Sequence, residues 1–289
     1  MRVLVTNDDG IFAPGLAAIT RALAAWAADE HEIVVVAPLA NHSGASAAVG
    51  TVYEREAISY RRVAVPGATG VCAFGVDAPP ALAVLVGTLG GFGPRPDVIV
   101  SGVNLGVNVG RSVLHSGTVG ATLAGAQLGV RGLAVSLRSG FPPEQWSTAT
   151  TLALGILPAL CAAPPRTVLN LNVPAVPLET LRGVRRARIS TSGIVKSATG
   201  GSALATAAAT GGTMTGGSED EGEVHLTLGT AIPTLGRVEE TEDPGDDAAL
   251  IAAGYATLTP IVGVHEDTAP DAQEVVRAAL GALDGLLGA

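Results

Sequence analysis

The chain begins with a short, mostly apolar run, Arg2–Thr6, that is followed directly by Asn7-Asp8-Asp9-Gly10. An apolar run of this length is typical of a strand that is buried on both faces of a parallel sheet. In open α/β sheets, ligands bind at the carboxyl ends of such strands. The sequence therefore predicts an α/β fold with Asp8 and Asp9 at the ligand-binding edge of its sheet.

The two adjacent carboxylates have two interpretations at this stage. They are costly to place together unless a positive charge lies near them, and Mg²⁺ and related hard cations prefer oxygen ligands. Asn, Asp and Gly are also common turn formers, so the segment could be a solvated turn. The tetrapeptide alone leaves both interpretations open.

Strand-like and helix-like segments alternate up to about residue 175, which predicts a Rossmann-like, doubly wound and mostly parallel sheet with helices on both faces. We expect Pro158 to kink or end the last helix of this series. The expected strands are residues 2–6, 32–37, 97–101, 133–137 and 167–172, with 61–65 as a further candidate, and the expected helices are residues 15–28, 71–89, 118–128 and 144–161.

The sequence changes character in its last third, so we expect a catalytic core over residues 1–182 and a C-terminal extension over 183–289. Residues 193–223 are dominated by Gly, Ala, Ser and Thr, a composition typical of a flexible loop or arm. The acidic run at residues 239–247 is predicted to be a solvated loop. A possible strand at residues 183–192, strands at residues 224–228 and 255–259, and an amphipathic helix at residues 270–287 complete the extension.

Composition excludes several classes of protein. Of 289 residues, 47% are hydrophobic and 15% charged, which predicts a substantial core. The net charge is −9 and no basic cluster has interleaved aromatics, which argues against a nucleic-acid partner. The uncharged stretches 78–94 and 150–165 contain Pro and Gly and are shorter than a normal membrane span, so no membrane partner is expected. Cys72 and Cys161 form no CxxC pair, and we expect buried free thiols in a reducing, cytoplasmic compartment.

Three loops that follow expected strands are rich in small polar residues: residues 7–15, 41–46 and 101–120. In a doubly wound sheet such strand exits can converge on one crevice. Together they supply two carboxylates, an amide oxygen and hydroxyls for a hard cation. Ser116-Gly117-Thr118 leads into a helix whose free N–H groups suit a phosphate. A metal ion beside an anion pocket is the minimum apparatus for phosphate-ester hydrolysis.

Each of these loops also has a purely structural interpretation. The glycines of residues 101–120 could merely permit tight turns, and Ser43, Ser46, Ser116 and Thr118 could be helix caps. The sequence lacks other well-known nucleotide-binding and catalytic motifs. It has no GxxxxGK[ST] phosphate loop, no GxGxxG after the first strand as nicotinamide-dependent oxidoreductases require, and no GxSxG nucleophile elbow.

The segments NDDGIFAPG, APLANHSGAS, GPRPDVIVSGVNLGVNVG and HSGTVGATLAG occur in this order and are followed by LNLNVP and GYATLTP. In this order and spacing they resemble the SurE family of metal-dependent nucleotide phosphatases. The resemblance implies a Rossmann-like core and hydrolysis of nucleoside 5′- or 3′-monophosphates to nucleoside and phosphate. Some family members also act on other phosphomonoesters or on short polyphosphate.

The resemblance also implies roles for particular residues. Asp8, Asp9, Ser43 and Asn104 would bind one divalent metal ion per subunit, Mg²⁺ or Mn²⁺. Asp8 or Asp9 would also orient or deprotonate the attacking water. Members of the family use a protruding C-terminal hairpin, here about residues 193–237, to form homodimers or homotetramers. The phosphate pocket would be lined by Gly44, Ser116, Gly117 and Thr118.

The sequence departs from the family's common pattern at His42, Arg111, His115 and Ala124. None of these departures removes a proposed metal ligand. Two functions follow: a nucleoside monophosphate phosphomonoesterase that uses metal-activated water, or, as the alternative, a catalytically weak regulatory protein that binds nucleotide or phosphate. The preferred base, the sugar and the phosphate position stay open.

Overall fold

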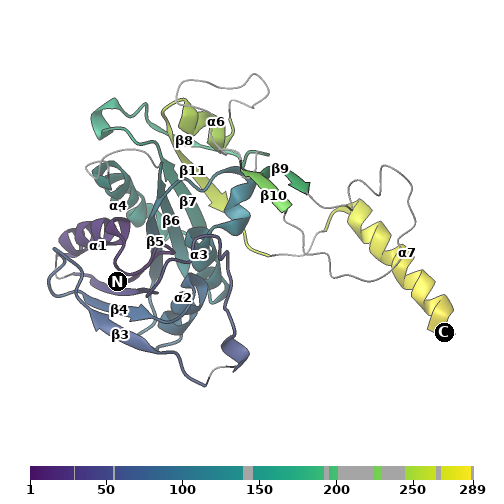
Figure 1. Cartoon of the computed structure of the whole chain (residues 1–289), viewed down its shortest axis with the longest axis horizontal. Coiled ribbons are helices and arrows are strands. Elements are labelled where there is room, and N and C mark those ends of the chain that lie inside the picture. Colours follow the sequence, from purple (N-terminus) through teal and green to yellow (C-terminus); the bar gives the residue numbers. More distant parts are fainter. Residues whose placement is uncertain are drawn as a thin grey trace.

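The computed structural model of the chain describes residues 1–28, 30–54, 56–138, 146–191, 195–200, 224–228, 245–264 and 268–287. Its centre is a nine-stranded sheet with the strand order β3-β4-β2-β1-β5-β6-β7-β11-β8 (Figure 1). The six strands from β4 to β7 in this order are parallel, and β3 and β11 run antiparallel to β4 and β7. The strands of this sheet are β1 (Arg2–Thr6), β2 (Glu32–Pro38), β3 (Tyr60–Val63), β4 (Cys72–Val76), β5 (Val98–Leu105), β6 (Arg131–Leu137), β7 (Val168–Val173), β8 (Val184–Arg186) and β11 (Ala256–Ile261).

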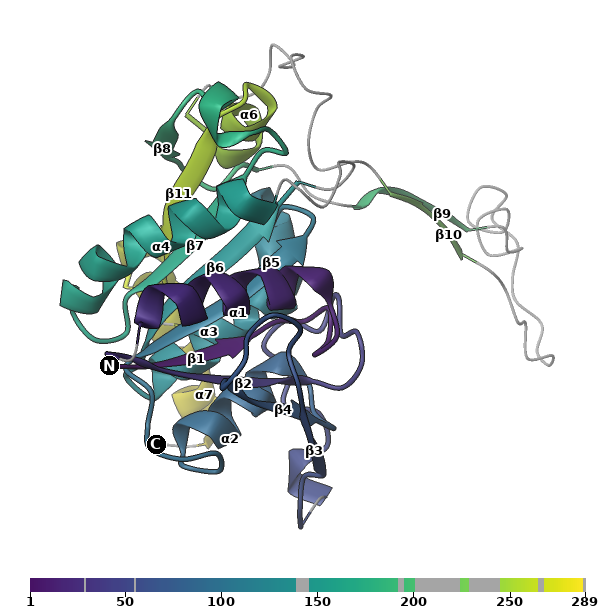
Figure 2. The same cartoon turned by 90° about the vertical axis from the view of Figure 1, so that its left-hand side faces the viewer.

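Helices cover both faces of the sheet, which confirms the doubly wound α/β fold. Helices α1 (Pro14–Ala27) and α4 (Trp146–Ala162) pack together on one face, and α2 (Pro80–Thr88) and α3 (Gly117–Gln127) pack together on the other (Figure 2). Short 3₁₀ helices lie at η1 (Val52–Glu54), η2 (Gly110–His115) and η4 (Leu178–Thr180).

The strand residues alternate between two hydrophobic layers. In β1, Val3 and Val5 pack in the layer that holds Leu16 of α1, whereas Leu4 packs in the layer that holds Leu82 of α2. All of these side chains are buried. Burial on both faces explains why the parallel strands are continuous apolar runs in the sequence.

The chain order places the ligand-binding edge between β1 and β5. From β1 the chain proceeds to β2 on one side of the sheet and later returns to β5 on the other side. Thr6, the last residue of β1, is the register partner of Ser101, and β5 continues beyond this pair to Leu105. This reversal of strand order is the position at which open α/β sheets bind ligands.

One expectation about secondary structure is wrong, and a second is narrowed. Residues 71–89 are not one helix but strand β4 followed by α2, whose first turn contains Pro80. A short apolar run does not by itself distinguish a buried strand from a buried helix, and Pro79-Pro80 marks the actual helix start. Of the two effects expected of Pro158, the helix end is excluded, because α4 continues to Ala162; a kink stays a prediction. Pro158 is exposed, so water can reach the backbone groups that its ring leaves unpaired.

The C-terminal extension adds strands β8 and β11 to the main sheet, with α6 (Asp247–Ala252) packed beside β11. Strands β9 (Val195–Gly200) and β10 (Val224–Leu228) form an antiparallel hairpin that extends away from the sheet (Figure 2). Helix α7 (Pro270–Leu287) also extends away from the body of the protein (Figure 1). The remaining parts of the expected arm, residues 193–194, 201–223 and 229–237, lie outside the described residues, as do residues 239–244 of the acidic run.

Two further expectations need correction. Asp247, the last residue of the acidic run, is fully buried in the first turn of α6 and does not lie in a solvated loop. Cys72 and Cys161 are free thiols as expected, but both are only partly buried. Among the described residues, the structure contains no helix with the length and apolarity needed to cross a membrane.

Candidate active site

The tetrapeptide after β1 forms a tight, internally hydrogen-bonded turn. The side-chain amide of Asn7 donates to the carbonyl of Gly10 at 2.9 Å, and the backbone N–H of Ala13 donates to the same carbonyl at 3.0 Å. Gly10 has a φ of +100°, a backbone conformation that residues other than glycine rarely adopt. Asp8 is only 3% exposed, so the segment is a turn but not a solvated one.

Asp8 lies against the amino end of α3. The hydroxyl of Thr118 donates to Asp8 Oδ1 at 2.6 Å. A Cβ on Gly117 would lie 2.7 Å from Asp8 Cβ and 2.9 Å from Asp8 Oδ2, so only glycine fits here. Burial raises the pKa of Asp8 above its ordinary value, and the Thr118 hydroxyl opposes this shift only in part.

Asp9 lies against the end of β5. The backbone N–H of Leu105 donates to Asp9 Oδ2 at 3.3 Å. Burial raises the pKa of Asp9, and the charge of Asp8 raises it further. The register of the β5–β6 pairing shifts between Ser101 and Asn104. Such an irregularity typically bends the strand, and here it lies directly before Asn104. The Asn104 amide nitrogen donates to the carbonyl of Gly106 at 2.7 Å, so its Oδ1 remains available as a ligand.

The loop at residues 41–46 joins the other two loops through the backbone. The N–H of His42 donates to the carbonyl of Asp8 at 2.7 Å. The Ser46 N–H and hydroxyl donate to the carbonyls of His115 and Leu114 at 3.1 and 2.7 Å. The three strand exits therefore converge on one edge of the sheet, as the sequence predicts.

Within this loop, the exposed Ser43 is held by Asn41, because both its N–H and its hydroxyl donate to Asn41 Oδ1 at 2.7 Å. Asn41 has no role in the sequence-based assignment. Gly44 has a φ of +87°, and the position where its Cβ would lie is open space.

The expected phosphate-pocket residues divide into two kinds. Ser116 is the N-cap of α3, and its hydroxyl accepts a hydrogen bond from the N–H of Val119 at 3.1 Å, so the capping interpretation holds for this residue. Gly117 and Thr118 instead contact Asp8. Of the positions that depart from the family pattern, Arg111 and His115 are exposed and Ala124 is buried.

The donor set at this edge suits a hard divalent cation. The three loops supply two carboxylates, one of them nearly buried, an amide oxygen and a serine hydroxyl, although the Ser43 hydroxyl itself is hydrogen-bonded to Asn41. Among the described residues, neither carboxylate has an ion-pair partner. The same part of the chain contains no cluster of three His, Cys, Asp or Glu side chains, because half of the proposed ligands come from Asn and Ser.

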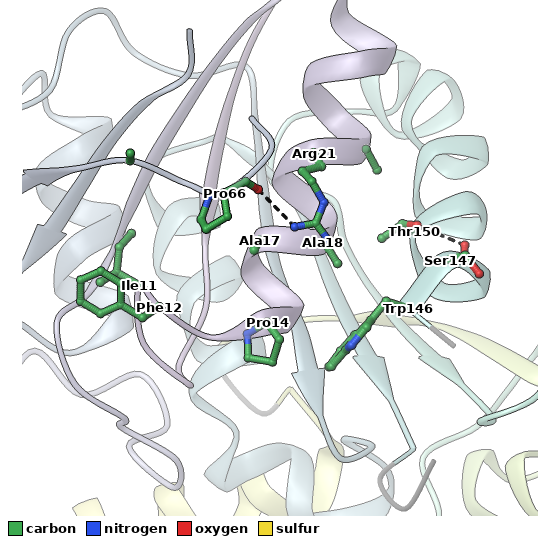
Figure 3. A pocket seen from close by; sticks show the side chains of 12 residues that line it. Ile11, Phe12, Pro14, Ala17, Ala18, Arg21, Pro66, Trp146, Ser147 and Thr150 are labelled. Atoms are coloured by element: carbon green, nitrogen blue, oxygen red, sulfur yellow. Dashed lines mark hydrogen bonds between the residues drawn. The ribbon is translucent and has the colours of Figure 1, made fainter. Parts of the chain in front are cut away.

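A pocket of about 930 Å³ lies next to this edge, on the face covered by α1 and α4. In Figure 3, Phe12 and Trp146 lie on opposite sides of the first turn of α1. The guanidinium of Arg21 donates to the carbonyl of Pro66 at 3.2 Å (Figure 3). None of the proposed metal ligands, Asp8, Asp9, Ser43 and Asn104, is among the residues that line this pocket.

Comparison with known proteins supports the interpretation of these motifs. The family model for survival protein SurE matches residues 3–196. The chain is 33% identical over 279 residues to a 5′/3′-nucleotidase SurE from Escherichia coli O1:K1, which covers 96% of this chain and 95% of that protein. It is 34% identical over 285 residues to a 5′/3′-nucleotidase SurE from Cronobacter sakazakii, with the same coverage of each.

A solved structure shows the same fold. The crystal structure of the SurE protein from Aquifex aeolicus matches with a TM-score of 0.66 at 23% identity and covers 99% of each chain. The sequence motifs, the family model over most of the chain and the similarity to these relatives agree with one another. The chain therefore belongs to the SurE family.

Proposed function

We propose that the chain is a divalent-metal-dependent phosphomonoesterase that hydrolyses nucleoside 5′- and 3′-monophosphates to nucleoside and phosphate. The names of its relatives describe this class of substrate. The observation that carries the proposal is the convergence of three loops on two adjacent carboxylates that have no cationic partner among the described residues. In the proposal, Asp8, Asp9, Ser43 and Asn104 hold one ion, Mg²⁺ or Mn²⁺.

The two carboxylates have different tasks in this proposal. When bound, the metal ion would polarise the phosphoryl group and lower the pKa of a bound water. Asp8 is nearly buried and accepts the Thr118 hydroxyl, so it serves as a fixed ligand. Asp9 is partly exposed, so it is better placed to orient the attacking water or accept its proton.

The phosphate would lie between Gly44 and the amino end of α3. Gly44 lacks a side chain and borders open space, which leaves room for a phosphoryl group. The backbone N–H groups of a helix amino terminus favour an anion, and Ser116, Gly117 and Thr118 form that terminus. Few basic residues lie in these loops, so backbone N–H groups have to stabilise much of the developing charge.

The test is a phosphate-release assay on the 5′- and 3′-monophosphates of adenosine and guanosine, with Mg²⁺, Mn²⁺ or Co²⁺ added separately. We expect phosphate release that depends on the metal and falls more than about 100-fold in Asp9→Asn. Replacing a residue that only supports a metal ligand typically lowers activity by about 10- to 100-fold, so a larger loss indicates a ligand. Asp271→Asn on the exposed start of α7 is the matched control. Nucleotide binding without release under any metal would instead select the regulatory protein.

We also propose that the chain forms a homodimer or homotetramer through the β9–β10 hairpin. The support is the family resemblance and the position of the hairpin away from the sheet (Figure 2). Light scattering coupled to size-exclusion chromatography tests this directly. A monomer at all concentrations would contradict it.

A further inference from the structure

The segment from Leu105 to Gly110 joins two parts of the proposed site. It follows Asn104, a proposed metal ligand, and leads through η2 to Ser116 at the start of α3. Asp9 depends on the same segment, because its carboxylate accepts the N–H of Leu105. A shift of this segment would therefore disturb both carboxylate and amide ligands at once.

Two asparagines of β7 hold the middle of this segment. The side chain of Asn172 accepts the backbone N–H of Asn108 at 2.7 Å and donates to the carbonyl of Asn108 at 3.0 Å. Asn170 donates to the same carbonyl at 2.9 Å. Both asparagines are fully buried, and their spacing of two places them on the same face of the strand.

Ser136 of the neighbouring strand β6 adds a third contact. Its hydroxyl accepts a hydrogen bond from the side-chain amide of Asn108 at 2.8 Å. The carbonyl of Leu137, also in β6, accepts the N–H of Gly106 at 2.7 Å. The segment is therefore fixed along its length by the carboxyl ends of two parallel strands.

Asp247 holds the end of the segment. Its two carboxylate oxygens accept the N–H of Gly110 at 3.1 and 3.0 Å. Oδ1 also accepts the N–H groups of Ser190 and Ala248 at 3.0 and 2.8 Å. Asp247 is fully buried, and it connects the C-terminal extension to the loop that leads to Ser116.

We propose that Asn170, Asn172 and Asp247 are positioning residues that fix residues 105–110, and thereby Asn104 and Asp9, in the geometry that phosphate-ester hydrolysis requires. The catalytic part of this inference rests on the function proposed above. Burying polar side chains is costly unless each is hydrogen-bonded. Here the two asparagines bond to the backbone of Asn108, and Asp247 bonds to the backbone of Gly110, Ser190 and Ala248. A site holds its reacting groups accurately only when neighbouring residues fix them.

The first test uses Asn172→Ala, with Thr257→Val as its matched control. Thr257 is fully buried on β11 and is the register partner of Asn172, but its hydroxyl forms no hydrogen bond with the 105–110 segment or with any other described residue. We expect kcat to fall about 10- to 100-fold in Asn172→Ala, as is typical when an outer-shell partner is removed. Thr257→Val should keep kcat within about twofold of wild type, since the mechanism requires nothing of it.

The second test does not depend on activity. Hydrogen–deuterium exchange of the metal-free protein should become faster at residues 105–110 in Asn172→Ala and remain unchanged there in Thr257→Val. If wild type releases no phosphate, the proposed function fails, and the exchange result alone decides whether these residues hold the loop.

Asp247→Asn is the milder variant if Asn172→Ala does not fold. Its remaining oxygen can still accept the N–H groups of Ser190 and Ala248 and, at 3.1 Å, that of Gly110. The new amide replaces Oδ2, the other acceptor of the Gly110 N–H, and places a donor against that N–H. We expect faster exchange at Gly110 and a kcat about 10-fold lower, with KM less affected. In either folded variant, unchanged exchange or an unchanged kcat would overturn the positioning role.

Discussion

Asp8 and Asp247 are both buried carboxylates, but their surroundings differ. Asp8 accepts a hydrogen bond from the Thr118 hydroxyl, and its neighbour Asp9 has no ion-pair partner among the described residues. Asp247 accepts backbone N–H groups from Gly110, Ser190 and Ala248. Burial is the main cause that raises the pKa of both. Burial therefore does not distinguish a carboxylate that ties loops together from one suited to a cation. The neighbouring charges do, because Asp246, next to Asp247, is paired with Arg188, whereas Asp9, next to Asp8, has no such partner in the part of the chain that the structure describes.

The largest effect on stability is expected at Asp247, whose carboxylate accepts three backbone N–H groups. Asp247→Ala should lower the free energy of unfolding by about 3 kcal/mol, because each buried N–H left without a partner costs ~1–3 kcal/mol. The adjacent Asp246→Ala should cost less than about 1 kcal/mol, because its ion pair with Arg188 is long, at 3.8 Å, and Arg188 is largely exposed. Urea unfolding of both variants measures the difference. Equal losses of unfolding free energy in the two variants would show that the hydrogen bonds of Asp247 contribute no more than the ion pair of Asp246.

A smaller loss is expected where Asp8 meets α3. Gly117→Ala would place a Cβ 2.7 Å from Asp8 Cβ, and such overpacking typically costs about 1–3 kcal/mol. Phosphate release should fall with it, since Asp8 has to move. Gly155→Ala in α4 is the control, because a Cβ there meets nothing within 4 Å, and alanine should stabilise the helix by roughly 0.5–1 kcal/mol. Wild-type activity in Gly117→Ala would show that the Asp8 contact is unimportant.

The smallest expected effect is a pH dependence at Asp247. Its pKa is raised from 3.8 by burial, and the charge of Asp246 acts in the same direction. The folded state therefore binds the proton more tightly than the unfolded state, and the stability contributed by this group falls as pH rises above about 4. Thermal unfolding between pH 4 and 7 should show wild type losing stability relative to Asp247→Asn. If wild type instead gained stability relative to Asp247→Asn between pH 4 and 7, the pKa of Asp247 would be lowered by folding and the prediction would be wrong.

Much of the fold is predictable from the sequence because the central strands are buried on both faces. β1, β2, β5, β6 and β7 all coincide with apolar runs, with shifts of a few residues at their ends. The boundary between β4 and α2 is not predictable in this way, because residues 71–89 are almost continuously apolar and the break is marked only by Asp77 and Pro79-Pro80. Periodicity distinguishes half-buried elements, and it fails where both faces are covered.

The site is predictable to the level of its loops but not of its contacts. Asp8 and Asp9 follow a central strand, and strand exits converge in this fold, so their proximity to residues 104–105 and 116–118 could be expected. The roles of Asn172 and Asp247 could not, because their partners are backbone groups of a distant loop. Two asparagines at a spacing of two in an apolar strand were the available signal, and Asp247 had none, since it ends an acidic run.

The most direct test of the central claim is phosphate release from adenosine 5′-monophosphate by the wild type, Asp9→Asn and Asp247→Asn, each with Mn²⁺ and with excess EDTA. We expect wild-type release that chelation abolishes, a loss of more than about 100-fold in Asp9→Asn and a loss of about 10-fold in Asp247→Asn. Release by Asp9→Asn at the wild-type rate, or release by wild type that EDTA does not reduce, would contradict the assignment of the Asp8–Asp9 edge as a metal-dependent active site.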